Sequence, residues 1–262
     1  MQVTRLRVYP IKSFAGNDVR AAHVQPWGLE GDRRWAVVDP DGEPITAREA
    51  NSLLGLTAEI LTDGGVLLGD GRSDPVRVDV PMDSAPTPVG HSRQGTALPA
   101  SAEAAAWLSE RLGRDARLVW QPDPTARIVN PKHGGLPGDH VSLADVGPLL
   151  LTSEASLSQL DDWAGESLDM VRFRPNVVID GDVPFAEDDW PSLRLGAIGF
   201  RVAGMCDRCV MTTIDPTTLA RGKEPIRTLA QYRKKDGKTF FGVWLVPQER
   251  GTIAVGDEVT PL

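Results

Sequence analysis

The sequence contains little sulfur and little histidine. Two of its 262 residues are cysteines and four are histidines. A zinc site of four cysteines is therefore impossible. A Cys2His2 site is not supported either, because the four histidines lack the short spacing that such sites use; they are His23, His91, His133 and His140.

Long apolar stretches are also missing. No run approaches the roughly 18 residues that a membrane-spanning helix needs, and the N-terminus has no apolar segment of a secretion signal. We therefore expect a cytoplasmic protein without a membrane partner. In that compartment a structural disulfide is not expected.

The charge distribution and the known motifs exclude further classes. The formal net charge is −8, without a block of like charges, so nucleic acid is not an expected partner. The sequence has no glycine-rich dinucleotide loop, Walker loop, His-Glu-x-x-His motif or Gly-x-Ser-x-Gly motif. We do not expect bound pyridoxal phosphate.

Alternating apolar and polar residues dominate what is present. Val76, Val78 and Val80 alternate with Arg77 and Asp79, which is typical of a half-buried strand. Further strands are predicted at 5–8, 35–38, 117–120, 177–179, 200–202, 209–214, 240–246 and 252–255. Many short strands with frequent turns predict a mainly β (α+β) fold, made of two β-barrel-type domains with a few short helices.

The helices are recognised by their caps. A serine or threonine before a periodic segment predicts a helix start, and a following glycine predicts its end. The pattern predicts helices at 46–49, 101–112, 153–164 and 228–236.

Composition suggests where domains divide. Residues 81–100 are rich in proline, serine, threonine and glycine and have no periodicity. We predict an N-terminal domain at 1–85, a linker or long loop at 86–100, and a second domain at 101–262. A second irregular stretch, 122–139, favours a lid or binding loop.

Both cysteines lie in one segment, with Cys206 and Cys209 on either side of Arg208. A thiolate is a soft metal ligand, and an adjacent guanidinium favours the thiolate over the thiol. The β-branched residues that follow predict a strand. The alternative is that these cysteines are small buried apolar residues.

Five patterns in the right order resemble one family over the whole chain. They are Tyr9-Pro10-Ile11-Lys12-Ser13, Gly31-Asp32-Arg33-Arg34-Trp35, Leu149-Leu150-Leu151-Thr152-Ser153, Phe173-Arg174-Pro175-Asn176, and Cys206-Asp207-Arg208-Cys209 followed by Thr212-Thr213-Ile214-Asp215-Pro216. The chain resembles the MOSC family, in the subgroup that has an N-terminal MOSC β-barrel domain and includes the mitochondrial amidoxime-reducing components and their bacterial relatives.

The resemblance implies a molybdenum cofactor, a molybdopterin whose metal takes a protein thiolate. By match, the metal ligand and catalytic residue is Cys209. Cys206 matches a cysteine common in the family but not the ligand position, and we expect it either to pack in the interior or to support the residues around the metal. The resemblance also implies cofactor contacts from Lys12, Ser13, Arg33, Ser153, Arg174, Asn176, Arg208 and Trp244. The arginine forks suit a phosphate and a pterin edge.

The implied activity is reduction of the nitrogen–oxygen bond of a small N-hydroxylated substrate. Electrons would come from a separate ferredoxin- or flavoprotein-type donor, because no cysteines remain for an iron–sulfur cluster. An acidic stretch at 182–189 is expected to be a solvated loop or a docking patch for that donor. Two alternatives stay open: a persulfide carrier at Cys209, and a cofactor carrier without turnover.

Overall fold

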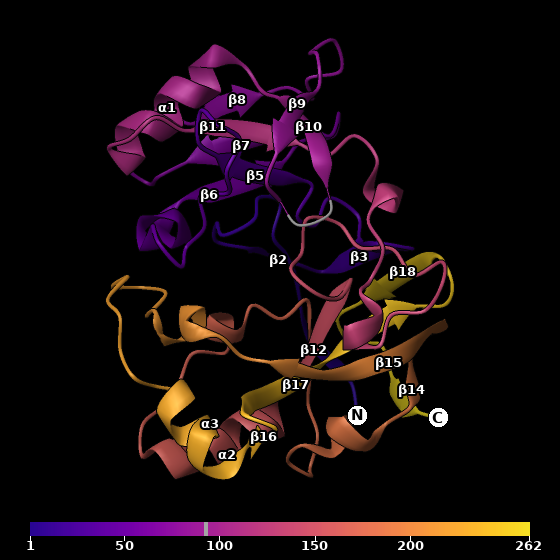
Figure 1. Cartoon of the computed structure of the whole chain (residues 1–262). Helices are drawn as coiled ribbons and strands as arrows, with labels where there is room; N and C mark the ends of the chain where they lie inside the picture. Colours follow the sequence, from indigo (N-terminus) through magenta and orange to yellow (C-terminus); the bar gives the residue numbers. More distant parts are fainter. Residues whose placement is uncertain (92–93) are drawn as a thin grey trace.

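One large sheet organises the lower part of the molecule in Figure 1. The computed structural model describes residues 1–91 and 94–262. The strand order in this sheet is β19 (Val259–Pro261), β14 (Ser192–Leu195), β15 (Ile198–Asp207), β17 (Lys238–Pro247), β12 (Leu149–Ser153), β13 (Val177–Ile179), β1 (Val3–Val8) and β2 (Asn17–Val19), with β16 (Lys234–Lys235) paired to β17. Its strands pair antiparallel except β12 with β13.

The described residues form three smaller sheets as well. They are β5 (Trp35–Val38), β11 (Arg117–Trp120), β10 (Gly95–Pro99) and β9 (Thr87–Val89); β6 (Thr57–Ile60), β7 (Val66–Gly69) and β8 (Val76–Val78); and β18 (Gly251–Ala254), β3 (Ala21–Gln25) and β4 (Gly28–Leu29). The first two lie in the upper part of Figure 1. The prediction of a mainly β (α+β) fold is confirmed.

The described residues form three α-helices, α1 (Ala102–Leu112), α2 (Glu154–Ala164) and α3 (Ile226–Tyr232). The Ser101 and Ser153 hydroxyls accept hydrogen bonds from backbone N–H groups three residues on, as predicted. Gly113 and Gly165 end α1 and α2 in the left-handed conformation, which glycine adopts without a Cβ clash.

One predicted helix is wrong, and another has different bounds from those predicted. Residues 46–49 form a single turn, and the 3-10 helix η1 (Asn51–Gly55) follows. Helix α3 begins at Ile226 rather than at Thr228, because the Glu224 carboxylate accepts the Thr228 N–H at 3.1 Å and so takes over the capping role. It ends before Arg233, and Gly237 belongs instead to the hairpin of β16 and β17.

The predicted linker at 86–100 contains strands β9 and β10, and β10 pairs with β11. Pro88 is tolerated in β9 because this strand lies at the edge of its sheet, where a residue can lack the backbone N–H that pairs with a neighbouring strand. Two residues of this range, 92–93, lie outside the described residues. The other irregular stretch, 122–139, packs against β15, where Arg201 donates to the Gly134 carbonyl at 3.0 Å.

Two apolar cores do not follow the predicted domain division. One core surrounds the large sheet and includes Leu6 of β1. The other contains Trp35 together with Trp107 and Leu108 of α1. The first strand therefore belongs to the large sheet, and α1 belongs with the upper sheets.

The acidic stretch at 182–189 is only partly a solvated loop. Asp182 and Asp189 are exposed, whereas two carboxylates of the 3-10 helix η5 (Ala186–Asp189) turn inward. Glu187 is 1% exposed and accepts a hydrogen bond from the Ser156 hydroxyl at 2.7 Å, while Asp188 pairs with Arg233. Along residues 1–91 and 94–262, no helix is long and apolar enough to cross a membrane.

The position of α1 predicts the effect of a core substitution. Leu108 is fully buried in the core that holds Trp35, so Leu108→Ala should lower the free energy of unfolding by about 3 kcal/mol through lost burial and the cavity left behind. Urea denaturation measures this. Glu110→Ala, on the exposed face of the same helix, should change it by about 0.5 kcal/mol or less; equal effects of the two variants would contradict this packing.

Candidate functional site

A cavity of about 190 Å³ is lined by segments from both halves of the chain. Its lining includes all of the predicted site residues except Ser153 and Asn176, namely Lys12, Ser13, Arg33, Arg174, Arg208, Cys209 and Trp244. They come from both halves of the chain: the first three follow β1 and β4, and the others come from the loops and strands around the large sheet. Tertiary packing thus brings most of the predicted set together.

The backbone is strained at this cavity. Ser13, Arg33 and Arg174 have φ values of 72°, 48° and 55°, a left-handed region that residues with a Cβ seldom occupy. Such strain persists only where the surroundings enforce it, and it is common at functional sites. The Ser13 hydroxyl accepts the Ala47 N–H at 3.1 Å, which holds the turn that carries Arg48.

The two cysteines have different environments. Cys209 is half-buried and precedes the 3-10 helix η6 (Val210–Thr213), so the predicted strand at 209–214 is wrong. The Thr212 hydroxyl donates to the Cys209 carbonyl at 3.0 Å, a local bond that favours the helical turn over a strand. Cys206 is 1% exposed, and burial raises the pKa of its thiol to about 11.

The arginine between the cysteines acts on Cys206 and not on Cys209. Arg208 donates to the Cys206 sulfur and to the Phe173 carbonyl, both at 2.7 Å. The cation beside Cys209 is instead Arg48, from a distant segment. Burial alone would lower the pKa of Arg48, but the Asp145 carboxylate and the Cys209 sulfur raise it above its usual value.

Asp145 holds two cations of the cavity wall, Lys12 and Arg48. It lies 2.5 Å from Lys12 Nζ and 2.6 Å from Arg48 Nη2. Lys12 also donates to the Leu143 carbonyl at 3.0 Å, and burial lowers the pKa of this lysine although Asp145 opposes that change. Sequence reasoning missed Arg48 and Asp145, because neither has a distinctive spacing from the cysteines.

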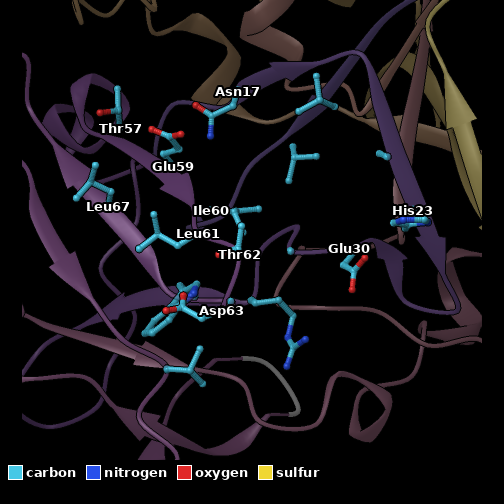
Figure 2. A pocket seen from close by; sticks show the side chains of 18 of the residues that line it. Asn17, His23, Glu30, Thr57, Glu59, Ile60, Leu61, Thr62, Asp63 and Leu67 are labelled. Carbon is cyan, nitrogen blue, oxygen red and sulfur yellow. The ribbon is translucent and has the colours of Figure 1, made fainter.

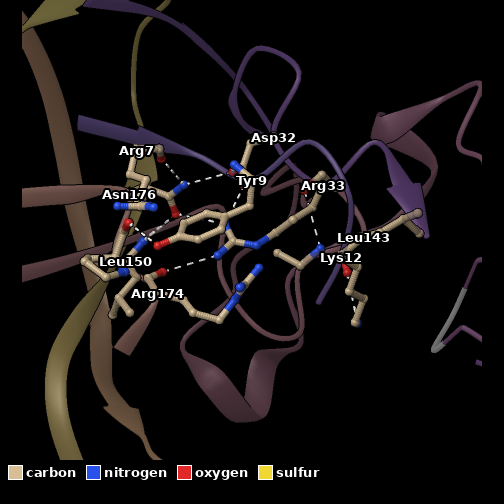
Figure 3. Close-up of polar contacts among 12 residues, drawn as sticks. Arg7, Tyr9, Lys12, Asp32, Arg33, Leu143, Leu150, Arg174 and Asn176 are labelled. Carbon is tan, nitrogen blue, oxygen red and sulfur yellow. Dashed lines mark hydrogen bonds and ion pairs between the residues drawn. The ribbon is translucent and has the colours of Figure 1, made fainter. Parts of the chain in front are cut away.

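Asn176 does not line the cavity but fixes Arg33, which does. The Asn176 Oδ1 atom accepts from Arg33 Nη1 at 3.0 Å, and its Nδ2 atom donates to the buried Asp32 carboxylate at 3.0 Å. Arg33 and Arg174 lie 4.6 and 4.1 Å from the centre of the Tyr9 ring. Figure 3 shows this network, with Lys12 beside it.

Ser153 lies outside the cavity lining. It is 3% exposed, and its hydroxyl caps α2 by accepting the Ser156 N–H at 3.4 Å. The capping prediction is thus confirmed, while the predicted contact with a cofactor stays a prediction.

The donors of the cavity fit an anionic, polar cofactor such as molybdopterin. Three lining side chains have a buried nitrogen without a hydrogen-bond partner in the described part of the chain, namely Arg174 Nη2, Arg208 Nε and Trp244 Nε1. Guanidinium groups suit phosphate and pterin edges, and the half-buried Cys209 supplies a soft sulfur ligand.

A larger, open cleft of about 1280 Å³ lies apart from this cavity. Figure 2 shows its wall, with His23, Glu30, Glu59 and Asp63 among the labelled side chains. Its lining residues include neither cysteine nor any predicted site residue. We therefore place the chemistry in the smaller cavity.

The fold and the site define a class: a mainly β protein with a cavity whose wall contains several cationic side chains and a cysteine. Comparison with known proteins gives its family. Residues 1–115 match the MOSC N-terminal beta barrel domain, and residues 138–260 match the MOSC domain. The chain is 31% identical to mitochondrial amidoxime-reducing component 1 of Homo sapiens, across 98% of this chain and 82% of that protein. It is 32% identical to mitochondrial amidoxime reducing component 2 of Bos taurus over the same shares.

The chain therefore belongs to the MOSC family. It is also 28% identical to the molybdenum cofactor sulfurase of Danio rerio, across 99% of this chain and 34% of that longer protein. The resemblance inferred from five motifs is thereby confirmed.

The unequal burial of the cysteines predicts selective alkylation. In chain prepared without bound molybdenum, iodoacetamide should modify Cys209 and leave Cys206 unmodified, because Cys206 is covered and its thiol pKa is raised. Peptide mass spectrometry after a short reaction measures this, and unfolding in guanidinium should expose both. Native Cys209→Ser protein should take up no label; rapid labelling of Cys206 in that variant would contradict the assignment.

The ion pairs of Asp145 predict a pH-dependent stability. Burial alone would raise the pKa of Asp145, but Lys12 and Arg48 lower it well below its usual value. Its stabilisation is therefore complete above the unfolded pKa, about 4, and is lost as the pH falls below that value. Asp145→Asn should reduce the free energy of unfolding by about 1 kcal/mol at neutral pH.

The check is urea unfolding at pH values from about 7 to about 3. The difference between the parent chain and Asp145→Asn should shrink on acidification. Asp74→Asn, at an exposed carboxylate without an ion pair in the described residues, should differ little from the parent at any of these pH values. A constant difference for Asp145→Asn would show that its ion pairs do not stabilise the fold.

Proposed function

We propose that this protein is a molybdenum-cofactor-dependent oxidoreductase that reduces the nitrogen–oxygen bond of small N-hydroxylated compounds. Cys209 Sγ is the protein ligand to the metal. The amidoxime-reducing names of two relatives that span most of this chain support the reaction class. The single observation that carries the proposal is the convergence of Cys209 with unpartnered, buried cationic donors on one cavity.

Each side chain has a distinct task in this proposal. Arg33 and Arg174, fixed over the Tyr9 ring, hold the polar edges of the cofactor by paired N–H groups. Lys12 places a cation beside them. Arg48 lies next to Cys209 and offsets the negative charge of its thiolate. Arg208 fixes the segment between the cysteines through Cys206 and Phe173.

The bound molybdenum supplies the two-electron redox chemistry. Reduction of an amidoxime consumes two electrons and two protons, breaks the N–O bond and gives an amidine and water. The two electrons come from a separate ferredoxin- or flavoprotein-type donor, since both cysteines are already assigned to this cavity. The compartment expected for the reaction is the cytoplasm.

Metal content tests the ligand assignment. The chain made in a host that builds molybdopterin should contain about one molybdenum atom per chain by elemental mass spectrometry, because Cys209 completes the metal's sulfur ligands. Cys209→Ser should lose most of that metal while remaining folded by circular dichroism. Cys206→Ser is the matched control and should keep it. Retention of molybdenum in Cys209→Ser would show that Cys209 is not the metal ligand.

Turnover tests the reaction separately. Holoprotein reduced by dithionite and methyl viologen should convert benzamidoxime to benzamidine, and Cys209→Ser should not. Chromatography of the reaction mixture measures the benzamidine formed. Full molybdenum content without conversion would leave the cofactor carrier as the function.

A persulfide carrier is the second candidate, supported by the sulfurase relative that matches the whole length of this chain and by the half-exposed Cys209. In this case Cys209 would accept a sulfur atom from a cysteine desulfurase and pass it on. Labelled sulfur on Cys209 in chain that binds no molybdenum would favour this candidate over the reductase.

A further inference from the structure

A second cavity, of about 220 Å³, adjoins the candidate site. Arg174 and Met211 line both cavities, so these two side chains form the partition between them. The wall of the second cavity also contains Arg7 and Arg172, and most of its other lining residues are apolar. Three arginine side chains thus line one small space, and two of them, Arg7 and Arg172, have no task in the proposed reaction.

The three arginines have more donors than acceptors. A guanidinium has five N–H groups. Arg174 donates from Nη1 to the Phe14 carbonyl at 2.6 Å and has no carboxylate partner in the described residues. A buried nitrogen of each side chain lacks a hydrogen-bond partner there, namely Arg7 Nε, Arg172 Nε and Arg174 Nη2. Burying charged groups with unpartnered donors is costly, and a negative charge in the cavity that these side chains line would lower that cost.

The balancing carboxylates lie toward solvent. Arg7 pairs with Asp18 at 3.0 Å and Arg172 with Asp215 at 2.6 Å, but the Asp18 and Asp215 side chains are 55% and 33% exposed. Their charge is therefore screened by water. Asp169 also lines the cavity, and its carboxylate accepts the Val171 N–H at 2.8 Å.

Arg174 has the strongest need for an anion. The residue is 8% exposed. Burial lowers the pKa of Arg174 to about 10; the positive charges of Arg33 and Arg7 add to that decrease, while Tyr9 and Asp32 oppose it. Figure 3 shows Arg7, Arg33 and Arg174 grouped around Tyr9. A bound anion would offset this repulsion.

We propose that Arg7, Arg172 and Arg174 bind a small oxyanion of the phosphate type in this second cavity. Paired N–H groups of guanidinium match the oxygen spacing of phosphate. The apolar part of the wall, which includes Leu54 and Ile214, keeps water away and so strengthens the electrostatic attraction. This site goes beyond the proposed function: it shares Arg174 with the candidate cofactor site, while Arg7 and Arg172 have no task there.

The same chemistry has two sources. One is a free oxyanion, and the other is the phosphate of a cofactor that reaches past Arg174 and Met211 from the first cavity. We assign the free oxyanion, because the partition separates the two spaces. Comparison of cofactor-free chain with holoprotein distinguishes the two sources.

The test is isothermal titration calorimetry of the full chain with inorganic phosphate, at constant ionic strength set with chloride. We expect one phosphate per chain, bound by cofactor-free chain and holoprotein alike. Arg7→Gln and Arg172→Gln should each weaken binding about tenfold or more, because each removes a charge-assisted donor pair. Arg5→Gln is the matched control: it lies on the same strand and faces the same Asp18, but it does not line the cavity, so binding should be unchanged.

Three results would overturn the site: no phosphate binding, equal affinity of parent, Arg7→Gln and Arg172→Gln, or loss of binding only in Lys12→Gln, which alters the first cavity. Binding to cofactor-free chain alone, with the same dependence on Arg7 and Arg172, would keep the three-arginine site and assign it to the cofactor's phosphate. Circular dichroism confirms that each variant is folded. If Arg172→Gln unfolds, Arg172→Lys keeps the charge but not the paired geometry and should still weaken binding.

Discussion

The buried carboxylate of Asp32 joins three segments that are far apart in the sequence. It is fully buried and accepts hydrogen bonds from the Tyr9 N–H at 2.8 Å, from Asn176 Nδ2 at 3.0 Å and from Arg33 Nη1 at 2.5 Å. A charge in the interior is tolerated only when it is paired and fully hydrogen-bonded. Once these partners are fixed, Arg33 and the loop of Arg174 can occupy only one arrangement around the Tyr9 ring, and the cavity has its cationic wall.

The cavity wall carries more positive charge than the nearby carboxylates compensate. Asp145 compensates Lys12 and Arg48 near Cys209, whereas Arg174 has only a carbonyl acceptor in the described part of the chain. Arg174 lies between two cavities, so the same uncompensated guanidinium links the candidate cofactor site with the proposed oxyanion site. Left-handed backbone at Ser13, Arg33 and Arg174 indicates that the fold holds these residues in place at some cost.

Local rules succeeded where a serine cap decides the outcome and failed where another side chain, three or four residues away, bonds to the backbone instead. The caps at Ser101 and Ser153 depend on the residue and its own turn, so they could be read directly. The start of α3 depends on Glu224, and the form of the segment after Cys209 depends on its own hydroxyl bonds, which a strand propensity ignores. The segment around Pro88 was predicted to be a linker because both linkers and edge strands tolerate proline, which lacks a backbone N–H.

Short motifs and alternating patterns were enough to predict the mainly β fold, the family and most residues that line the candidate cavity, because these patterns are local properties of the chain. Which charge meets which group depended on the tertiary fold. It directed Arg208 to Cys206, placed Arg48 beside Cys209, and turned Glu187 inward. The physical reason is that ion pairing and burial depend on distances between segments that the order of residues along the chain does not specify.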